Sequence, residues 1–369
     1  MKRIVPYLLL LALWAPTLGY LIGWRSQELK GAENALKRVD LTRTTLAQGT
    51  WQTSINKGAE REHPLRAPLI RCRNQVLYWL YNRSTNFVEV GKEGYLYGSK
   101  YYEIYSGRKR QTEAHYEDVA TQMRKLQDTL DHYGVKFLSV IAPSKVRFDP
   151  GILKSSHARI PLDSMTDYTL LIDAYNTYGV NYLNLSQGLT NQRDTLRALP
   201  FSKVGIHWNT YGVYRCLPLW DNYVHEHFGY PLQSFQQAGG FWSDSLILKG
   251  DMDLAERMNL IQSPKLNMQF YPKFQRASPS DSLPKILFIS DSFFYQLMGT
   301  YAMSHISRDW EFWYYNKGFL NKQRRYKIPI NFDNRWERLL DFDIVVIMGT
   351  ETNISRFPYG LTDQVLTDN

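Results

Sequence analysis

The stretch ILFISDSFFYQL, residues 286–297, decides the fold and raises the question of function. It begins as a short, uniformly apolar run, which is typical of a strand buried in a parallel sheet. The run ends in Asp291-Ser292-Phe293, and an apolar, helix-compatible segment follows. A serine on such a turn projects its hydroxyl from the sheet edge, beside the N–H groups and positive dipole of the helix start. An Asp or Ser before a helix is equally what N-capping requires, so Ser292 is either a nucleophile or part of a helix cap.

Strand and helix patterns alternate along much of the chain. Buried strands are predicted at residues 135–143, 180–185, 285–290, 310–315 and 343–349. Helices are predicted at residues 115–132, 163–177, 209–227, 293–305 and 332–340. A further segment, VGKEGYLYG (90–98), is typical of a hairpin. The alternation predicts βαβ units, a mostly parallel sheet and helices on both of its faces.

Polar groups follow three of the predicted strands. They are Pro143-Ser144-Lys145, Asp291-Ser292, and the segment from Gly349 to Asn353. The active crevice of a parallel sheet lies outside the carboxyl ends of its strands, so we expect these groups to converge there.

A nucleophilic serine needs a base, and His207 has the most suggestive context. It lies in FSKVGIHWNTYGVY (201–214), just before a predicted helix with Asn209 or Thr210 as its cap. In GTETN (349–353), the glycine permits close backbone approach and the Asn353 amide is able to donate to an oxyanion. Taken singly, a satisfied histidine and an ordinary turn explain these two segments as well.

Together these segments resemble a known family. DSF (291–293), HWNTYG (207–212) and GTETN are similar to motifs of the SGNH (GDSL) esterase superfamily. More specifically they resemble its alginate O-acetyltransferase branch (AlgJ/AlgX-like, DHHW-type), in which the histidine segment precedes the serine segment. Three other pieces agree: VGKEGYLY (90–97) resembles a Gly-Lys-Asp-Gly-Trp-Leu-Phe hairpin, VIAPSK (140–145) a strand ending in Pro-Asp-Lys, and GDMDLAERMNL (250–260) a Gly-Asp-Leu helix segment. The resemblance covers roughly residues 60–355.

The resemblance implies a three-layer, flavodoxin-like α/β fold of the SGNH type, with a mostly parallel sheet and a permuted motif order. It also implies O-acetylation of a cell-surface or secreted polysaccharide, beside a membrane-bound O-acyltransferase that supplies the acyl group. Ser292 is then expected to be the nucleophile and His207 its base. The candidates for oxyanion or substrate contacts are Asn353, Asp291, Lys145, Glu351 and Trp208.

One position departs from the family pattern. In this branch the histidine segment has the sequence Asp-Thr-His-Trp or Asp-His-His-Trp, with an aspartate two residues before the histidine. In this chain Gly205 occupies the position of that aspartate. In serine proteases, loss of the acid lowers the catalytic rate by about 10⁴-fold, roughly 5.5 kcal/mol. The reason is that the acid fixes the imidazole tautomer and stabilises the imidazolium. Three explanations stay open. A Ser–His dyad is enough for catalysis, or the site has lost its catalytic activity. Alternatively, an acid from elsewhere in the chain reaches His207, namely Glu351, Asp251 or Asp253.

We therefore expect an extracytoplasmic O-acyltransferase with a Ser–His acyl-enzyme mechanism. A carbohydrate esterase is a close alternative, because it differs only in whether water or sugar attacks the acyl-enzyme. A polysaccharide-binding or scaffold protein without catalysis is the alternative from a different class, and Gly205 motivates it.

The N-terminus predicts a membrane anchor. Residues 4–24 contain no charged residue and follow Lys2 and Arg3. The run is longer than a signal-peptide core of about 7–15 residues and matches the about 20 residues that span a bilayer. We expect a single-pass inner-membrane anchor over residues 1–25, a stalk with short helices over 26–85, and a catalytic domain in the periplasm over 86–369. A cleaved signal, with Thr17-Leu18-Gly19 as a weak site, is the alternative.

Composition excludes several other classes. The net charge is +9, but the 44 basic residues are mostly scattered among 35 acidic ones, which favours a solvated surface over nucleic-acid binding. No Gly-rich phosphate loop and no HExxH motif occurs, so we expect no cofactor and no metal. The two cysteines, Cys72 and Cys216, exclude a multi-disulfide framework, and their pairing stays open.

Overall fold

The computed structural model describes residues 5–24, 27–31, 39–159, 165–232, 237–245, 248–274, 281–300, 302–323, 327–330 and 334–366. By their contacts they divide into one unit of residues 1–88 with 255–264 and a second of residues 89–254 with 265–369. The first unit contains the helices α1 (Val5–Leu21), α2 (Arg43–Ala47), α3 (Thr50–Glu62) and α4 (Arg66–Tyr81). Helix α1, in the expected anchor segment, has 17 residues. Among the helices described, none combines the length and apolar character needed to cross a membrane.

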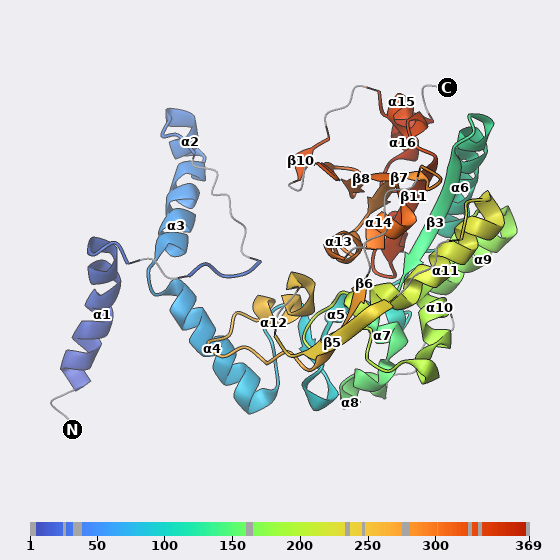
Figure 1. Cartoon of the computed structure of the whole chain (residues 1–369). Helices are drawn as coiled ribbons and strands as arrows, with labels where there is room; N and C mark the ends of the chain where they lie inside the picture. Colours follow the sequence, from blue (N-terminus) through green and yellow to red (C-terminus); the bar gives the residue numbers. More distant parts are fainter. Residues whose placement is uncertain are drawn as a thin grey trace. The chain divides into compact units, whose positions relative to one another are not determined.

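A seven-stranded sheet forms the centre of the second unit (Figure 1). Its strand order is β10-β9-β8-β7-β11-β3-β4. In chain order the strands are β3 (Lys136–Ala142), β4 (Tyr182–Asn184), β7 (Lys285–Ser290), β8 (Asp309–Tyr314), β9 (Gly318–Asn321), β10 (Ile328–Pro329) and β11 (Ile344–Thr350). The five strands from β8 to β4 pair in parallel, whereas β9 and β10 extend the sheet in antiparallel fashion at one edge. Every residue of β11 is buried, as expected for a strand covered on both faces.

Helices cover both faces of this sheet. Alternate residues of β7 and β11 divide between two hydrophobic clusters, because successive side chains of a strand point to opposite faces. One cluster joins the sheet to α6 (Glu113–His132), α9 (Asp167–Tyr178), α15 (Arg335–Leu340) and α16 (Thr362–Val365). The other joins it to α10 (Leu185–Asn191), α11 (Thr210–Phe228), α13 (Phe294–Gly299) and α14 (Ala302–Ile306). The predicted α/β fold, with helices on both faces of a mostly parallel sheet, is therefore confirmed.

Several local predictions match the structure. The hairpin comprises β1 (Val88–Val90), the 3-10 turn η1 (Lys92–Gly94) and β2 (Leu96–Gly98), and Gly94 supplies a left-handed φ of 76°. Asn209 caps α11 by accepting from the N–H of Gly212 at 2.9 Å.

The prediction of a single helix at 293–305 is wrong, because α13 and α14 are separate helices. The Thr300 hydroxyl bonds to the carbonyl of Leu297 and accepts from the N–H of Ala302, which ends one helix and caps the next.

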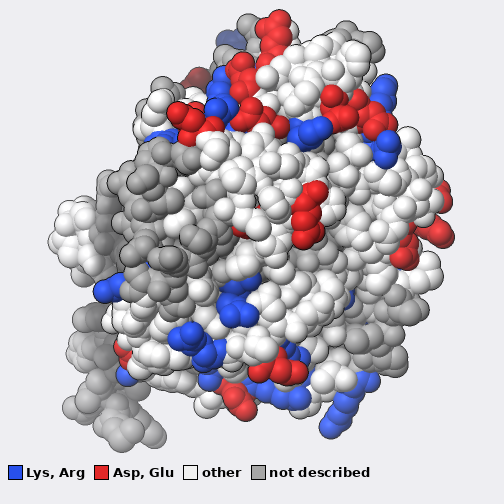
Figure 2. Space-filling view, turned by 45° about the vertical axis from the view of Figure 1, so that its right-hand side comes forward, with Lys and Arg blue, Asp and Glu red and all other residues white. Residues whose placement is uncertain are grey.

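Other elements carry no strong sequence signal. An antiparallel ribbon pairs β5 (Gln237–Ser243) with β6 (Gln269–Phe274). The short helices are α5 (Ser99–Tyr105), α7 (Lys145–Phe148), α8 (Ser155–Ala158) and α12 (Asp253–Arg257), and the remaining 3-10 turns are η2 (Pro150–Ile152), η3 (Arg193–Thr195), η4 (Lys249–Asp251) and η5 (Ile354–Arg356). Cys72 and Cys216 are both free thiols. On the face shown in Figure 2, acidic and basic side chains are interspersed among the described residues.

Gly349, near the end of β11, allows a test of the packing at this sheet edge. A Cβ there would lie 2.5 Å from Oη of Tyr359 and 2.7 Å from the ring of Phe357. We predict that Gly349→Ala lowers the free energy of unfolding by about 1–3 kcal/mol, as overpacking does, measured by urea denaturation. Lys125→Ala, on the exposed face of α6, is the control and should change it by under about 0.5 kcal/mol. An unchanged midpoint for Gly349→Ala would show that the neighbouring rings move freely.

Candidate active site

Ser292 lies on the turn between β7 and α13, at the carboxyl edge of the sheet. The turn is held by main-chain bonds, since the N–H of Tyr295 donates to the Ser292 carbonyl at 3.2 Å. The serine side chain is partly exposed, whereas its neighbours Asp291 and Phe293 are buried. Helix α13 has only six residues, so the strong helix dipole expected behind Ser292 is not present.

Asp291 is fully buried and is bonded only to neutral donors. Its Oδ1 accepts from the N–H of Phe293 at 2.9 Å. Its Oδ2 accepts from the N–H and the hydroxyl of Thr350, at 2.9 and 3.0 Å, and from Nδ2 of Asn353 at 2.9 Å. These bonds join the end of β7 to the end of β11. Asp291 therefore fixes the serine turn against the GTETN segment and, being fully buried, is not placed to contact a substrate.

His207 and Ser292 come together as the sequence predicted. Nε2 of His207 is 2.8 Å from Oγ of Ser292, within the range expected for a nucleophile and its base. The imidazole packs against the ring of Phe293, with centroids 4.7 Å apart. Its side chain is 14% exposed, so solvent or a substrate is able to reach the pair.

Asp253 is the acid beside His207. Its Oδ2 is 2.8 Å from Nδ1 of His207, and its Oδ1 accepts from the N–H of Ile206 at 2.9 Å. The contact is within hydrogen-bonding distance but does not meet the geometry of a hydrogen bond, so it is a close approach of the carboxylate to the ring. Asp253 begins α12, far from the histidine segment in sequence. Of the three acids considered above, it is the one within bonding distance of the ring.

Gly205 has no room for a side chain. A Cβ at this position would lie 2.4 Å from the carbonyl oxygen of Gly250 and 2.8 Å from that of Asp251. On the other side, a Cβ on Gly250 would lie 3.5 Å from Cβ of His207. The main chain that delivers Asp253 thus fills the place of an acid at residue 205.

The other two acids have partners of their own. Glu351 is buried and pairs with Arg147, whose guanidinium lies 3.9 Å from the ring centre of Tyr168. Asp251 accepts from the Tyr271 hydroxyl at 2.8 Å. Burial, together with the nearby charge of Asp253, raises the pKa of Asp251 to about 6, although the hydrogen bond from Tyr271 opposes this shift. Neither acid is bonded to His207.

Two candidate residues do not lie where a substrate would meet them. Trp208 is fully buried and donates its indole N–H to the Phe293 carbonyl at 3.0 Å, so the expected sugar contact is corrected to a core contact. Lys145 is 3% exposed and donates to main-chain carbonyls, so its expected substrate contact is also corrected. Asn353 is partly exposed at the site, and its amide has a second N–H besides the one that Asp291 accepts.

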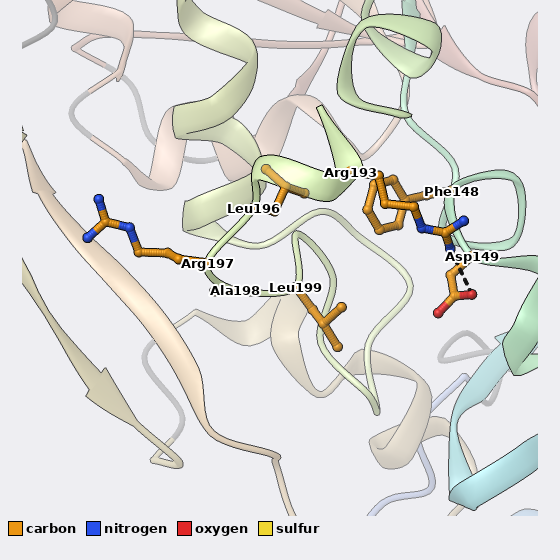
Figure 3. Close-up of a pocket in the computed structure, with 7 residues that line it drawn as sticks. All are labelled: Phe148, Asp149, Arg193, Leu196, Arg197, Ala198 and Leu199. Atoms are coloured by element: carbon orange, nitrogen blue, oxygen red, sulfur yellow. Dashed lines mark hydrogen bonds and ion pairs between the residues drawn. The ribbon is translucent and has the colours of Figure 1, made fainter. Parts of the chain in front are cut away.

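A shallow hollow lies on the segment that precedes the histidine loop (Figure 3). It has a volume of about 230 Å³ and is lined by Phe148, Asp149, Arg193, Leu196, Arg197, Ala198 and Leu199. Arg193 pairs with Asp149 at 2.9 Å, while Arg197 extends away from that pair. The wall of the hollow is fixed to α11, because Nδ2 of Asn209 donates to the Leu199 carbonyl at 2.9 Å. Within the described part of the chain, no cluster of three or more His, Cys, Asp or Glu residues is placed to hold a metal.

Comparison with known proteins agrees with the resemblance. Residues 88–216, which include His207 and end before Ser292, match the family model "ALGX: SGNH hydrolase-like domain, acetyltransferase AlgX". Over these residues the match agrees with the resemblance seen in the motifs, and it supports an enzyme of the SGNH-like acyltransferase or esterase class. No curated protein matches the chain.

Similar solved structures include three proteins of low identity. The O-acetyltransferase domain of Pseudomonas putida AlgJ is 15% identical, with a TM-score of 0.49 over 76% of this chain and 99% of that one. Pseudomonas aeruginosa AlgX is 13% identical, with a TM-score of 0.45 over 75% of this chain and 67% of that one. Bacillus cereus PatB1 with a sulfonyl adduct is 10% identical, with a TM-score of 0.44 over 66% and 91%.

The steric conflict at Gly205 gives a direct prediction. Gly205→Asp places an acid at the family position, yet we expect lower activity and a free energy of unfolding reduced by about 1–3 kcal/mol, because the new Cβ meets carbonyl oxygens. Gly205→Ala should reproduce the loss of stability without a carboxylate. Thermal unfolding and the rate of ester cleavage measure both effects. A more active, equally stable Gly205→Asp protein would contradict the packing described.

Proposed function

We propose that this protein is an O-acyltransferase that transfers an acetyl group through Ser292 to a hydroxyl of a polysaccharide. The observation that supports this most is the chain of contacts from Oγ of Ser292 through the ring of His207 to Asp253, with both contacts at 2.8 Å. A nucleophile, a base and an orienting acid are the parts that acyl transfer through serine requires. With an acid in place, Gly205 no longer argues for a degenerate site.

We assign the protons of the imidazole from these two contacts. Since Nε2 faces the serine hydroxyl, it accepts the Oγ–H, and Nδ1 then carries the ring proton toward Asp253. The carboxylate keeps this tautomer and stabilises the imidazolium that forms during the reaction. Because Asp253 is also bonded to the N–H of Ile206, it is itself held in place.

In the first step, Oγ of Ser292 attacks the acyl carbon of the donor while Nε2 of His207 takes the hydroxyl proton. The tetrahedral oxyanion needs a donor, and we assign this role to the second N–H of the Asn353 amide. The donor's leaving group departs with the proton from His207, and Ser292 is left acylated.

In the second step, a sugar hydroxyl gives its proton to Nε2 of His207 and its oxygen attacks the acyl carbon. The bond to Oγ of Ser292 breaks, and the serine recovers the proton from His207. The product is an O-acylated sugar, and the enzyme returns to its first state. If water attacks in place of sugar, the same residues carry out ester hydrolysis.

The acceptor class and the location are further parts of the proposal. The polysaccharide acceptor and a membrane-bound acyl donor partner follow from the family resemblance. A periplasmic location rests on the uncharged segment at residues 4–24.

We predict a covalent acetyl adduct on Ser292. Intact mass spectrometry of the full chain mixed with 4-nitrophenyl acetate should show a gain of one acetyl group, mapped to Ser292 by peptide analysis. Ser292→Ala should show none, and His207→Gln should acylate far more slowly. Absence of the adduct from folded wild-type protein would count against catalysis and favour a binding protein.

The fate of the adduct separates transfer from hydrolysis. We predict that the acetylated protein loses its acetyl group faster when oligosaccharide is added than in buffer alone, and that the acetyl group is then found on the sugar. Loss at the same rate in both solutions, with acetate as the only product, would favour an esterase.

The role of Asp253 gives a quantitative prediction. Asp253→Asn should slow acylation of Ser292 by about 10³- to 10⁴-fold, because His207 loses its orienting charge. The matched control is Asp251→Asn, which keeps a hydrogen-bond acceptor for the Tyr271 hydroxyl. It should slow acylation of Ser292 by less than about tenfold. Stopped-flow release of 4-nitrophenolate measures both rates. Equal, small effects of the two variants would indicate that a Ser–His dyad is enough.

A further inference from the structure

Lys145 is a buried cation whose hydrogen bonds all go to main-chain carbonyls. It follows β3 at the carboxyl edge and is 3% exposed. Its Nζ donates to the carbonyl of Leu96 at 2.7 Å, of Lys203 at 3.0 Å and of Gly205 at 2.9 Å. An ammonium has three N–H donors and no acceptor, so the three carbonyls match its full capacity.

Two of these carbonyls belong to the loop that carries the base. Lys203 and Gly205 precede His207, and the Gly205 carbonyl is two residues from the imidazole. The third carbonyl is in β2, and the N–H of Leu96 donates back to the Lys203 carbonyl at 2.9 Å. Lys145 therefore ties the histidine loop both to β2 and to the end of β3.

The opposite side of the same loop is bonded to the triad acid. The N–H of Ile206 donates to Asp253, while the Gly205 carbonyl accepts from Lys145. The peptide that joins Gly205 to Ile206 is thus held at both its oxygen and its nitrogen. This peptide immediately precedes His207, so its orientation sets the direction from which the imidazole approaches Ser292.

We propose that Lys145 is a positioning residue for catalysis, which holds the 203–206 loop so that His207 faces Ser292. The proposal rests on the proposed function, because its effect is expressed in the acylation of Ser292. It does not require Lys145 to touch the substrate, and the burial of its Nζ beneath the loop excludes that contact.

The charge state of Lys145 makes the contact sensitive to pH. Burial lowers the pKa of Lys145 to about 7, with Lys203 lowering it and Asp253 and Asp149 raising it. The ring of Tyr95 also faces its Nζ, at 5.7 Å from the ring centre. Because a neutral amine has two N–H groups, one of the three carbonyls loses its donor as the pH rises through this value.

The test is Lys145→Met, which keeps the length of the side chain and removes every donor. At pH 6.5 we expect the acylation rate at saturating 4-nitrophenyl acetate to fall by about 10²-fold, the cost of a misplaced catalytic group, with the half-saturating concentration unchanged. The control is Lys125→Met, which removes a lysine from the exposed face of α6, outside the histidine loop. That variant should acylate at the wild-type rate. Thermal unfolding checks that both proteins are folded.

Folded Lys145→Met that acylates as fast as wild type would overturn the proposal, while wild type without any adduct would overturn the proposed function. If Lys145→Met does not fold, the pH dependence of acylation in the wild-type protein tests the proposal instead. Its acylation rate should fall by about 3- to 10-fold from its maximum as Lys145 loses its proton, the effect of one lost hydrogen bond. A rate that rises to a plateau and stays flat to pH 9 would overturn the proposal.

Discussion

The arrangement of the site depends on the close approach of two main-chain segments at Gly205. Carbonyl oxygens of Gly250 and Asp251 occupy the space in which a side chain at residue 205 would lie. The glycine is needed for space, and the approach it permits brings the start of α12 to the histidine ring. An acid at residue 205 and an acid at residue 253 are therefore mutually exclusive solutions to the same problem. This chain has the second solution.

The rest of the site is fixed by groups that do not react. Asp291 joins the ends of β7 and β11 through hydrogen bonds to neutral donors, and so sets Ser292 beside Asn353. On the other side of the site, Lys145 joins β2 and the end of β3 to the loop before His207. Both are buried, hydrogen-bonded charges, and each satisfies the polar main chain where parallel strands end.

Much of this arrangement could be predicted from the sequence because it follows short-range rules. Apolar runs alternating with helical periodicity predicted the parallel strands, and the polar residues after them predicted which edge carries Ser292. The break between α13 and α14 was missed because a threonine cap inside an apolar segment does not interrupt helical periodicity. Trp208 was kept as a candidate for substrate contact although most aromatic side chains belong to the core, and its burial shows that it is a core residue.

Asp253 was one of three acids left open, and only the fold separates them. Nothing in GDMDLAER distinguishes Asp253 from Asp251, because their roles are set by which side chain turns toward Tyr271 and which toward His207. The pair of glycines at residues 205 and 250 was the available signal, since two glycines that meet permit a main-chain approach that other residues block.

The central claim is that Asp253 holds the ring proton of His207, and proton NMR of the wild-type protein tests it most directly. A strongly deshielded Nδ1 proton, assigned by its loss in His207→Gln, should be present in wild type and in Asp251→Asn and absent from Asp253→Asn. A resonance that survives in folded Asp253→Asn, or that is missing from folded wild type at low temperature, would contradict the account.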